Sequence, residues 1–147
     1  MPLSKSQQMS RVKGKNTGPE IFIRRILHKA GFRFRLHAKE LPGRPDIKLT
    51  KYKAVILING CFWHGHGCFL FSWPGTEKEF WIQKILSNVK RDRINLEKLK
   101  AQGWRPLVIW GCALKGKNKL HENELLEQIV MFLQSELPEK EITGKTN

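Results

Sequence analysis

The sequence predicts one α/β domain, and three stretches of the chain carry that prediction. The apolar run 54–58 is rich in β-branched residues and has the length of a buried strand. The run 104–110 reads as a second buried strand, and a helical pattern over 77–102 separates the two. At 147 residues the chain is long enough to bury a sizeable core, so we expect one folded domain over residues 19–136.

The N-terminal part of this domain is expected to supply a helix and two strands. The helix should begin at Thr17–Pro19 and end at Gly31. Its expected apolar face is Ile23, Ile26, Leu27 and Ala30. Alternation over 32–36 suits an edge strand, and the turn 41–45 should deliver Asp46 at the head of a strand over 47–49.

The rest of the chain is expected to be mostly helical. For the helix over 77–102, the expected apolar face is Phe80, Ile82, Ile85, Leu86, Val89, Leu96 and Leu99. A final acidic, amphipathic helix should span 122–136. We expect a disordered tail over 137–147.

The charge is strongly basic and unevenly distributed. The formal net charge is +14, and residues 1–53 hold 14 Lys or Arg against 3 acids, which places +11 on the N-terminal third. Such a field attracts a polyanion, and nucleic acid is the expected one. Solubility alone is the alternative, but a balanced mixture of charges would serve it as well. Residues 1–18 read as a flexible basic arm that contacts DNA through Arg11, Lys13 and Lys15.

No secretory signal and no apolar run near the roughly 20 residues of a membrane span are present. We therefore expect a soluble, intracellular protein.

Reactive side chains cluster directly after the strand 54–58. Two cysteines, two histidines and three glycines fall within residues 60–68, and the remaining cysteine, Cys112, follows the strand 104–110. Thiolate and imidazole are the ligands zinc prefers, so a zinc site is expected here. On spacing alone either His64 or His66 could be the ligand. The alternative is three unpaired structural cysteines.

Several polar residues are candidates for catalysis. The turn 41–45 should bring Asp46 near the end of the strand 54–58. Asn88 and Asp92 are spaced i, i+4 and share one face of their helix. On spacing alone, the favoured interpretation of Glu20 is an acid that complements the dipole of its helix.

A set of motifs follows in order along the chain: Pro42–Asp46, Gly60–His64, His66 with Cys68, Glu79–Trp81, Asn88–Arg93, Trp104–Arg105 and Trp110–Leu114. With these motifs the chain resembles the very short patch repair (Vsr) endonucleases over about residues 5–135. The resemblance implies a restriction-endonuclease-like mixed central sheet flanked by helices. It also implies a strand-specific enzyme that nicks DNA 5′ of the thymine in T:G mismatches left by deaminated 5-methylcytosine.

The resemblance implies roles for the catalytic candidates. Asp46 and the backbone carbonyl of Ile58 would hold a catalytic Mg²⁺, and His64 would act on the attacking water or on the phosphate. Glu20, Asn88 and Asp92 would support the metal-bound water, which reverses the dipole interpretation of Glu20.

The resemblance also implies a structural zinc and a set of DNA contacts. The zinc ligands would be Cys61, His66, Cys68 and Cys112. The side chains wedged into DNA would be Phe62, Trp63 and Trp81, and Arg44 would join the basic arm on the DNA backbone. The expected protein is a monomer in the bacterial cytoplasm, at the nucleoid, with a mismatch-repair accessory protein as a candidate partner.

The chain departs from some members of that family at four positions. Ile58 stands where some have threonine, so only its carbonyl could hold a metal. Asn59, Gly65 and Gly67 replace histidines, and Asn59 cannot supply acid–base chemistry. Two alternatives stay open: a restriction-type nuclease on matched DNA, and a zinc-stapled DNA-binding module without catalysis.

Overall fold

A computed structural model describes residues 18–61, 64, 66 and 75–145. Its elements are α2 (Gly18–Lys29), β1 (Arg35–Leu36), β2 (Ile47–Leu49), β3 (Ala54–Asn59), α3 (Lys78–Ala101), β4 (Arg105–Trp110), α4 (Glu122–Gln134) and β5 (Lys140–Ile142), with short 3-10 turns at Thr50–Tyr52 and Gly111–Ala113. Within these residues five strands form one sheet in the order β1-β2-β3-β4-β5. The sheet is mixed, because β1, β2 and β3 pair antiparallel whereas β3, β4 and β5 pair parallel. The predicted α/β class and mixed sheet are therefore confirmed.

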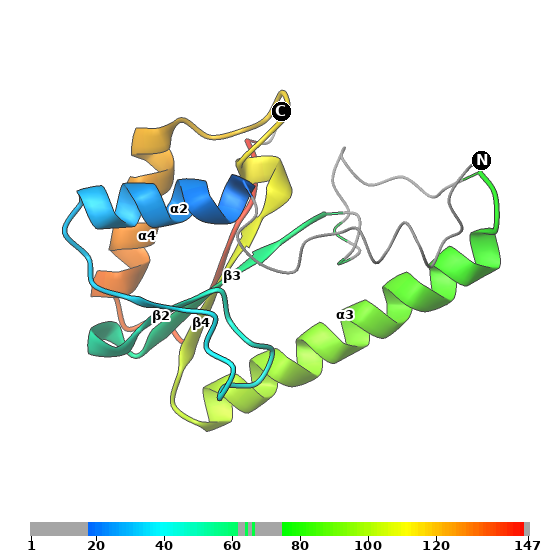
Figure 1. Ribbon diagram of the computed structural model, residues 1–147, viewed down its shortest axis with the longest axis horizontal. Helices are drawn as coiled ribbons and strands as arrows, with labels where there is room; N and C mark the ends of the chain where they lie inside the picture. The colour runs from blue at the N-terminus through cyan, green and yellow to red at the C-terminus, as the bar shows by residue number, and fades with distance from the viewer. Residues whose placement is uncertain (1–17, 62–63, 65, 67–74, 146–147) are drawn as a thin grey trace.

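Alternating residues of the two central strands face opposite layers. Ile56 and Ile109 belong to a core that α2 and α4 cover together, and Figure 1 shows these two helices side by side on that face. Val55 packs with Leu99 of α3 on the other face of the sheet. This two-residue period explains why the strands read as continuous apolar runs, since both of their faces are covered.

Helix α2 matches its predicted apolar face except at its end. Ile23, Ile26 and Leu27 are buried, whereas Ala30 is exposed because the helix stops at Lys29. The predicted edge strand 32–36 is paired only over Arg35–Leu36.

The predicted apolar face of α3 is wrong at two positions. Ile85 and Leu99 are buried, but Phe80 is 41% exposed and Leu86 is 55% exposed. A helix of 24 residues is about 36 Å long, whereas a six-residue strand spans about 20 Å. Figure 1 shows the N-terminal half of α3 running out beyond the sheet, so periodicity there does not mark contact with the core.

The expected disorder of the tail 137–147 is wrong for residues 140–142. They form β5, which pairs with β4, and the side chain of Ile142 is fully buried. Three residues are too short for a strand signal, and this strand forms only because β4 offers an edge. The predicted arm lies outside the described residues except for Gly18, which begins α2.

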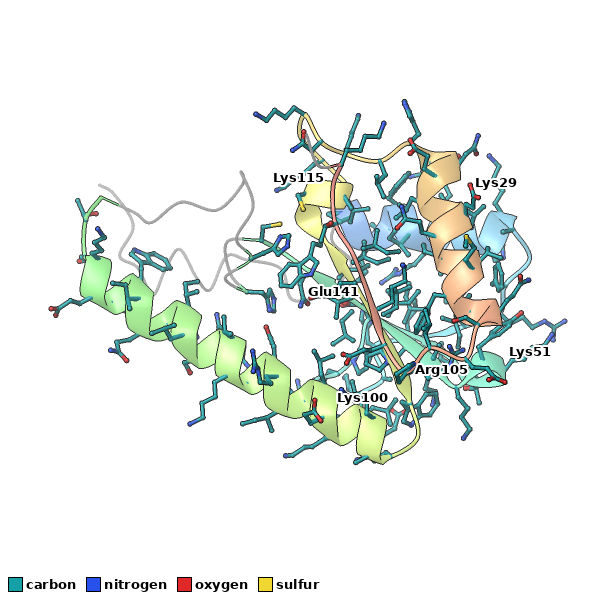
Figure 2. The ribbon with its side chains drawn as sticks, turned by 180° about the vertical axis from the view of Figure 1, so that it is seen from behind. Lys29, Lys51, Lys100, Arg105, Lys115 and Glu141 are labelled. Atoms are coloured by element: carbon teal, nitrogen blue, oxygen red, sulfur yellow. The ribbon has the colours of Figure 1, made fainter. Side chains whose placement is uncertain are left out.

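One basic residue has a structural task. The Arg105 guanidinium donates to the carbonyl oxygens of Phe132 and Leu133 at 3.1 Å, and of Tyr52 at 2.9 Å. Arg105 is the first residue of β4, and Figure 2 shows it on the side where α4 ends. These bonds satisfy carbonyls in the last turn of α4. Of the helices in the described ranges, none has both the length and the apolar composition needed to cross a bilayer.

Candidate active site and metal centre

The first site residue lies where β2 meets the end of β3. Asp46 immediately precedes β2, and its Oδ2 accepts a hydrogen bond from the backbone amide of Ile58 at 2.7 Å. The strand register pairs Ile47 with Ile56, so the antiparallel pairing brings Asp46 beside the last residues of β3. This juxtaposition is the one predicted from the turn 41–45.

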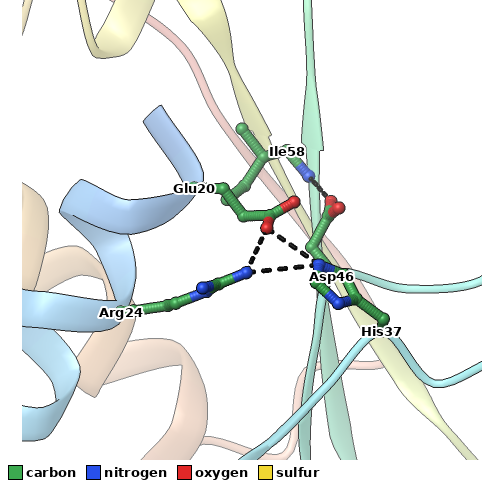
Figure 3. A network of polar contacts seen from close by, with 5 residues as sticks. All are labelled: Glu20, Arg24, His37, Asp46 and Ile58. Carbon is green, nitrogen blue, oxygen red and sulfur yellow. Dashed lines mark hydrogen bonds and ion pairs between the residues drawn. The ribbon is translucent and has the colours of Figure 1, made fainter. Parts of the chain in front are cut away.

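Glu20 lies beside Asp46, although the two are 26 positions apart in sequence. Its side chain is only 3% exposed, and its Oε2 contacts both the Arg24 guanidinium and His37 Nε2, the latter at 2.9 Å. Figure 3 shows these contacts with Asp46 next to them. The interpretation of Glu20 as an acid that simply complements the helix dipole is therefore insufficient, because the carboxylate is buried and bonded to Arg24 and His37.

The two neighbouring acids affect each other's charge. The pKa of Asp46 is raised to about 7, mainly by burial and also by the adjacent Glu20 carboxylate, against the lowering effects of the Ile58 amide and the Arg24 guanidinium. A strongly shifted carboxylate in a pair of acids is typical of a catalytic or cation-binding site.

A histidine and a second acid form another pair at the same place. His64 Nδ1 lies 2.5 Å from Asp92 Oδ2 on α3, and the His64 ring meets Trp110 edge-on with centroids 6.3 Å apart. An ionised Asp92 can only accept, so the proton between them belongs to His64 Nδ1. This leaves Nε2 as the ring nitrogen for exchange with a substrate.

These residues line one cavity of about 600 Å³ between β3 and α3. Its lining includes Asp46, Ile58, Asn59, His64, Asp92 and two arginines, Arg44 and Arg91. Arg91 donates to Asn88 Oδ1 at 3.1 Å, so Asn88 helps to orient the Arg91 guanidinium. The cavity thus holds acidic and basic groups facing each other, as a site for a phosphodiester and a cation requires.

A separate cluster of thiols and imidazole lies at the ends of β3 and β4. The ligand atoms of Cys61, His66 and Cys112 all lie within 4.8 Å of one another. His66 Nδ1 is 3.4 Å from Cys61 Sγ and 3.7 Å from Cys112 Sγ. A tetrahedral zinc would separate such atoms by about 3.6 Å, so these three residues fit zinc.

The surroundings of the cluster also suit a metal. The backbone amides of Cys112 and Gly144 each donate to a cysteine sulfur at 3.3 Å, as outer-shell donors to thiolates do. His66 stacks on Trp110 with centroids 4.2 Å apart. Burial lowers the pKa of His66, which favours the neutral imidazole that binds metals.

The remaining predicted site residues are less informative. Arg11, Lys13, Lys15, Phe62, Trp63 and Cys68, with Gly65 and Gly67, lie outside the described residues. Trp81 is described and is only 5% exposed, with its ring edge-on to that of Phe80.

Sequence reasoning missed four residues that shape the two centres: Arg24, His37, Arg91 and Gly144. A Cβ on Gly144 would lie 2.5 Å from the carbonyl oxygen of Cys112, so only glycine fits there. Spacing along α2 could have flagged Arg24 at i+4 from Glu20. His37 and Gly144 have no local signal, because their roles depend on strand pairing.

Comparison with known proteins identifies the class to which this fold and these centres belong. The chain is 41% identical over 126 residues to the DNA mismatch endonuclease Vsr of Escherichia coli (strain K12), covering 86% of this chain and 81% of that protein. It is 46% identical over 106 residues to the type II nicking enzyme V.XorIIP of Xanthomonas oryzae pv. oryzae, covering 72% and 78%. It is also 41% identical over 123 residues to the type II nicking enzyme V.NmeAIP of Neisseria meningitidis serogroup A, covering 82% and 88%.

The chain is therefore a DNA endonuclease, with DNA as its substrate. The family model described as DNA mismatch endonuclease Vsr matches residues 1–70, and the chain belongs to the Vsr family of DNA repair nucleases.

Proposed function

We propose that this endonuclease starts very short patch repair by nicking one strand 5′ of the thymine in a T:G mismatch. The observation that carries the proposal is the cavity in which Asp46, His64, Asp92 and two arginines meet, in a chain of a family described as mismatch endonucleases. Each group has a chemical task that hydrolysis of a phosphodiester requires.

Asp46 and the backbone carbonyl of Ile58 would hold a catalytic Mg²⁺, with Glu20 supporting its water shell. The fit rests on the donor set, since the Asp46 and Glu20 carboxylates lie side by side next to Ile58 and carboxylate oxygens are ligands that Mg²⁺ prefers. Mg²⁺ bound there would stabilise negative charge that develops on the phosphate. Ile58 has no side-chain ligand, but its amide already orients Asp46.

His64 would transfer a proton to or from the attacking water or the phosphate. Asp92 holds Nδ1, which fixes the ring and leaves Nε2 for the attacking water or for the phosphate. Asn88 and Asp92 were expected to hold water. The contacts favour a different proposal, in which Asp92 orients His64 and Asn88 orients Arg91.

Arg44 and Arg91 would bind the phosphates that flank the cleaved bond. Arg44 lies two residues before Asp46, with a left-handed φ of 46°, and lines the cavity. Guanidinium groups match phosphate oxygens in geometry as well as in charge. The basic arm with Arg11, Lys13 and Lys15 would extend these contacts along the DNA backbone.

Aromatic wedges would select the mismatch. A mismatched pair costs less to unstack than a matched one, so inserting Phe62, Trp63 and Trp81 would favour T:G sites. Because Trp81 is buried, its insertion requires α3 and its surroundings to open on DNA.

A structural zinc would hold the end of β3 to the end of β4. Its ligands would be Cys61, His66, Cys68 and Cys112, of which the first, second and fourth already lie at ligand spacing. Because Cys61 and His66 flank His64 in sequence, the zinc would stiffen the backbone that aims the catalytic ring. We further propose a monomer in the bacterial cytoplasm, at the nucleoid, with a mismatch-repair accessory protein as a partner.

Nicking of a matched recognition sequence is the second candidate. It is favoured by the relatives that carry the name type II nicking enzyme. A DNA-binding module without catalysis is disfavoured, because a pure binder gains nothing from two buried acids and a His–Asp pair beside a basic cavity.

End-labelled duplexes that differ by one T:G pair test the proposal. With Mg²⁺, we expect one nick, 5′ of the mismatched thymine, and no cut in the opposite strand or in the T:A control. Equal nicking of the T:A duplex would replace the proposal with the matched-DNA candidate. Binding without a nick in any duplex would leave the DNA-binding module.

A further inference from the structure

The Glu20 carboxylate is contacted by two side chains, Arg24 and His37, that have no role in the proposed reaction. Arg24 reaches it from one turn further along α2, and His37 reaches it from the loop after β1. Both contact the same oxygen, Oε2, and Figure 3 shows them on one side of the carboxylate with Asp46 nearby. His37 Nε2 lies 2.9 Å from that oxygen and 3.2 Å from a guanidinium nitrogen of Arg24, so the three side chains form one connected network.

His37 is also fixed through its backbone to the second acid of the site. Its amide donates to the carbonyl oxygen of Asp46 at 3.0 Å, which continues the β1–β2 pairing by one residue. Its φ of 48° is left-handed, a conformation that is unfavourable for most side chains and that recurs at functional sites. One residue therefore joins the main chain of Asp46 to the side chain of Glu20.

The connection through His37 matters because Asp46 and Glu20 are two acids placed side by side. Two carboxylates side by side repel each other, and Glu20 contributes to the raised pKa of Asp46. The Arg24 guanidinium and the His37 ring both contact Glu20 Oε2, and together they fix the rotamer of Glu20. The orientation of Glu20 toward Asp46 is thus set before any cation binds.

We propose that His37, together with Arg24, is a positioning residue that holds the Glu20 carboxylate aimed at the Asp46 site, so that the two acids form a prearranged divalent-cation site. This inference rests on the proposed function of Asp46 and Glu20. The competing view is that the Arg24–His37 pair only ties α2 to the hairpin and affects stability alone.

Cation binding without DNA separates these views. Mn²⁺ is titrated calorimetrically into the zinc-loaded, Mg²⁺-free protein, and the thermal midpoint of each variant is recorded. His37→Phe removes the polar contact to Glu20, whereas His37→Gln keeps a polar side chain there, and both variants place a β-carbon at the same left-handed φ of 48°. Arg24→Met removes the second contact. His28→Phe and Arg25→Met are the matched controls, since both residues are exposed on α2.

Loss of an outer-shell partner commonly costs 10- to 100-fold in metal affinity. We expect His37→Phe and Arg24→Met each to weaken Mn²⁺ binding by about tenfold or more, and His37→Gln to remain within about threefold of wild type. In a Glu20→Gln background, His37→Phe should have no further effect, because His37 acts through Glu20. The two control variants should match wild type.

A His37→Phe variant with a lower thermal midpoint but Mn²⁺ affinity within about twofold of wild type would overturn the inference. So would an undiminished effect of His37→Phe in the Glu20→Gln background. If His37→Phe does not fold, Arg24→Met decides on the same criteria.

Nicking assays keep this inference separate from the proposed function. If wild type binds Mn²⁺ as expected but does not nick T:G duplexes, the proposed function fails and the positioning role stands. If wild type nicks, and His37→Phe nicks equally well at a Mg²⁺ concentration that only half-saturates the wild type, the positioning role fails and the function stands.

Discussion

The Asp46 carboxylate accepts a 2.7 Å hydrogen bond from the backbone amide of Ile58, so this side chain links the start of β2 to the end of β3. This contact depends on the antiparallel register of β2 and β3, which brings Asp46 and Ile58 together from 12 positions apart in sequence. The acid is therefore oriented by the sheet rather than by a mobile loop. Sites supported by regular elements hold their geometry best.

Stability without divalent cations should fall as pH rises toward neutrality. The folded-state pKa of Asp46 is raised to about 7 by burial and by Glu20, so the folded state binds this proton more tightly than the unfolded state. The resulting stabilisation is complete below the unfolded pKa, about 4, and is lost as pH rises through about 7. Asp46→Asn should remove this dependence and, at pH 8, should raise the free energy of unfolding by on the order of 2 kcal/mol.

Urea unfolding of the zinc-loaded protein at pH 5 and pH 8 measures this effect. Glu40→Gln is the control, since Glu40 is exposed and pairs with Lys48, which lowers its pKa. Equal pH dependence in wild type and Asp46→Asn would contradict the buried acid pair.

Asp92→Asn should impair nicking through the tautomer of His64. The amide nitrogen of an asparagine would donate to Nδ1 and move the ring proton to Nε2, where it blocks proton uptake from water. We expect the single-turnover rate to fall by on the order of 100-fold with DNA affinity unchanged. Glu97→Gln, an exposed acid on the same helix, should nick normally. A normal rate for Asp92→Asn would remove His64 from proton transfer.

Zinc should co-purify with the protein at one atom per chain. Cys112→Ser and Cys61→Ser should each lose the metal and lower the thermal midpoint, because structural zinc contributes directly to folding. Elemental analysis of the purified variants measures the metal. Full zinc retention in Cys112→Ser would contradict a site built across the two strand ends.

Gly144→Ala should destabilise the same centre without touching a ligand. The new Cβ would lie 2.5 Å from the Cys112 carbonyl oxygen and 2.8 Å from that of Asn118, so the chain must shift away from Cys112. Overpacking of this kind costs about 1–3 kcal/mol. Gly75→Ala is the matched control, because no atom of the described residues lies within 4 Å of its Cβ position. Thermal unfolding and zinc content of the two variants give the comparison.

Local patterns were sufficient for part of this molecule. The two buried strands and the three helices follow from apolar periodicity and turn residues, and the turn before Asp46 predicted its place beside β3. The group Cys61, His66 and Cys112 followed from residue types at strand ends, although spacing alone left His64 and His66 open.

Features that depend on contacts between residues far apart in sequence could not be predicted from local patterns. On spacing alone, Glu20 is interpreted as an acid that complements the dipole of its helix. Nothing near it in sequence reveals that His37, after β1, and Asp46, before β2, lie against its carboxylate. Strand β5 and Gly144 fall in the segment that the sequence predicts to be a disordered tail, because β5 forms by pairing with β4 and Gly144 packs against Cys112. Phe80 and Leu86 follow the helical spacing of apolar residues, but they lie in a part of α3 that extends past the sheet. In that part the spacing does not predict burial.

The most direct test of the central claim is Asp46→Asn on a T:G duplex with Mg²⁺, with nicking and DNA binding measured on the same labelled substrate. The account predicts that DNA affinity stays within about threefold of wild type while the nicking rate falls by about a thousandfold or more. A nicking rate within about tenfold of wild type would show that the cavity at Asp46 is not where the strand is cut.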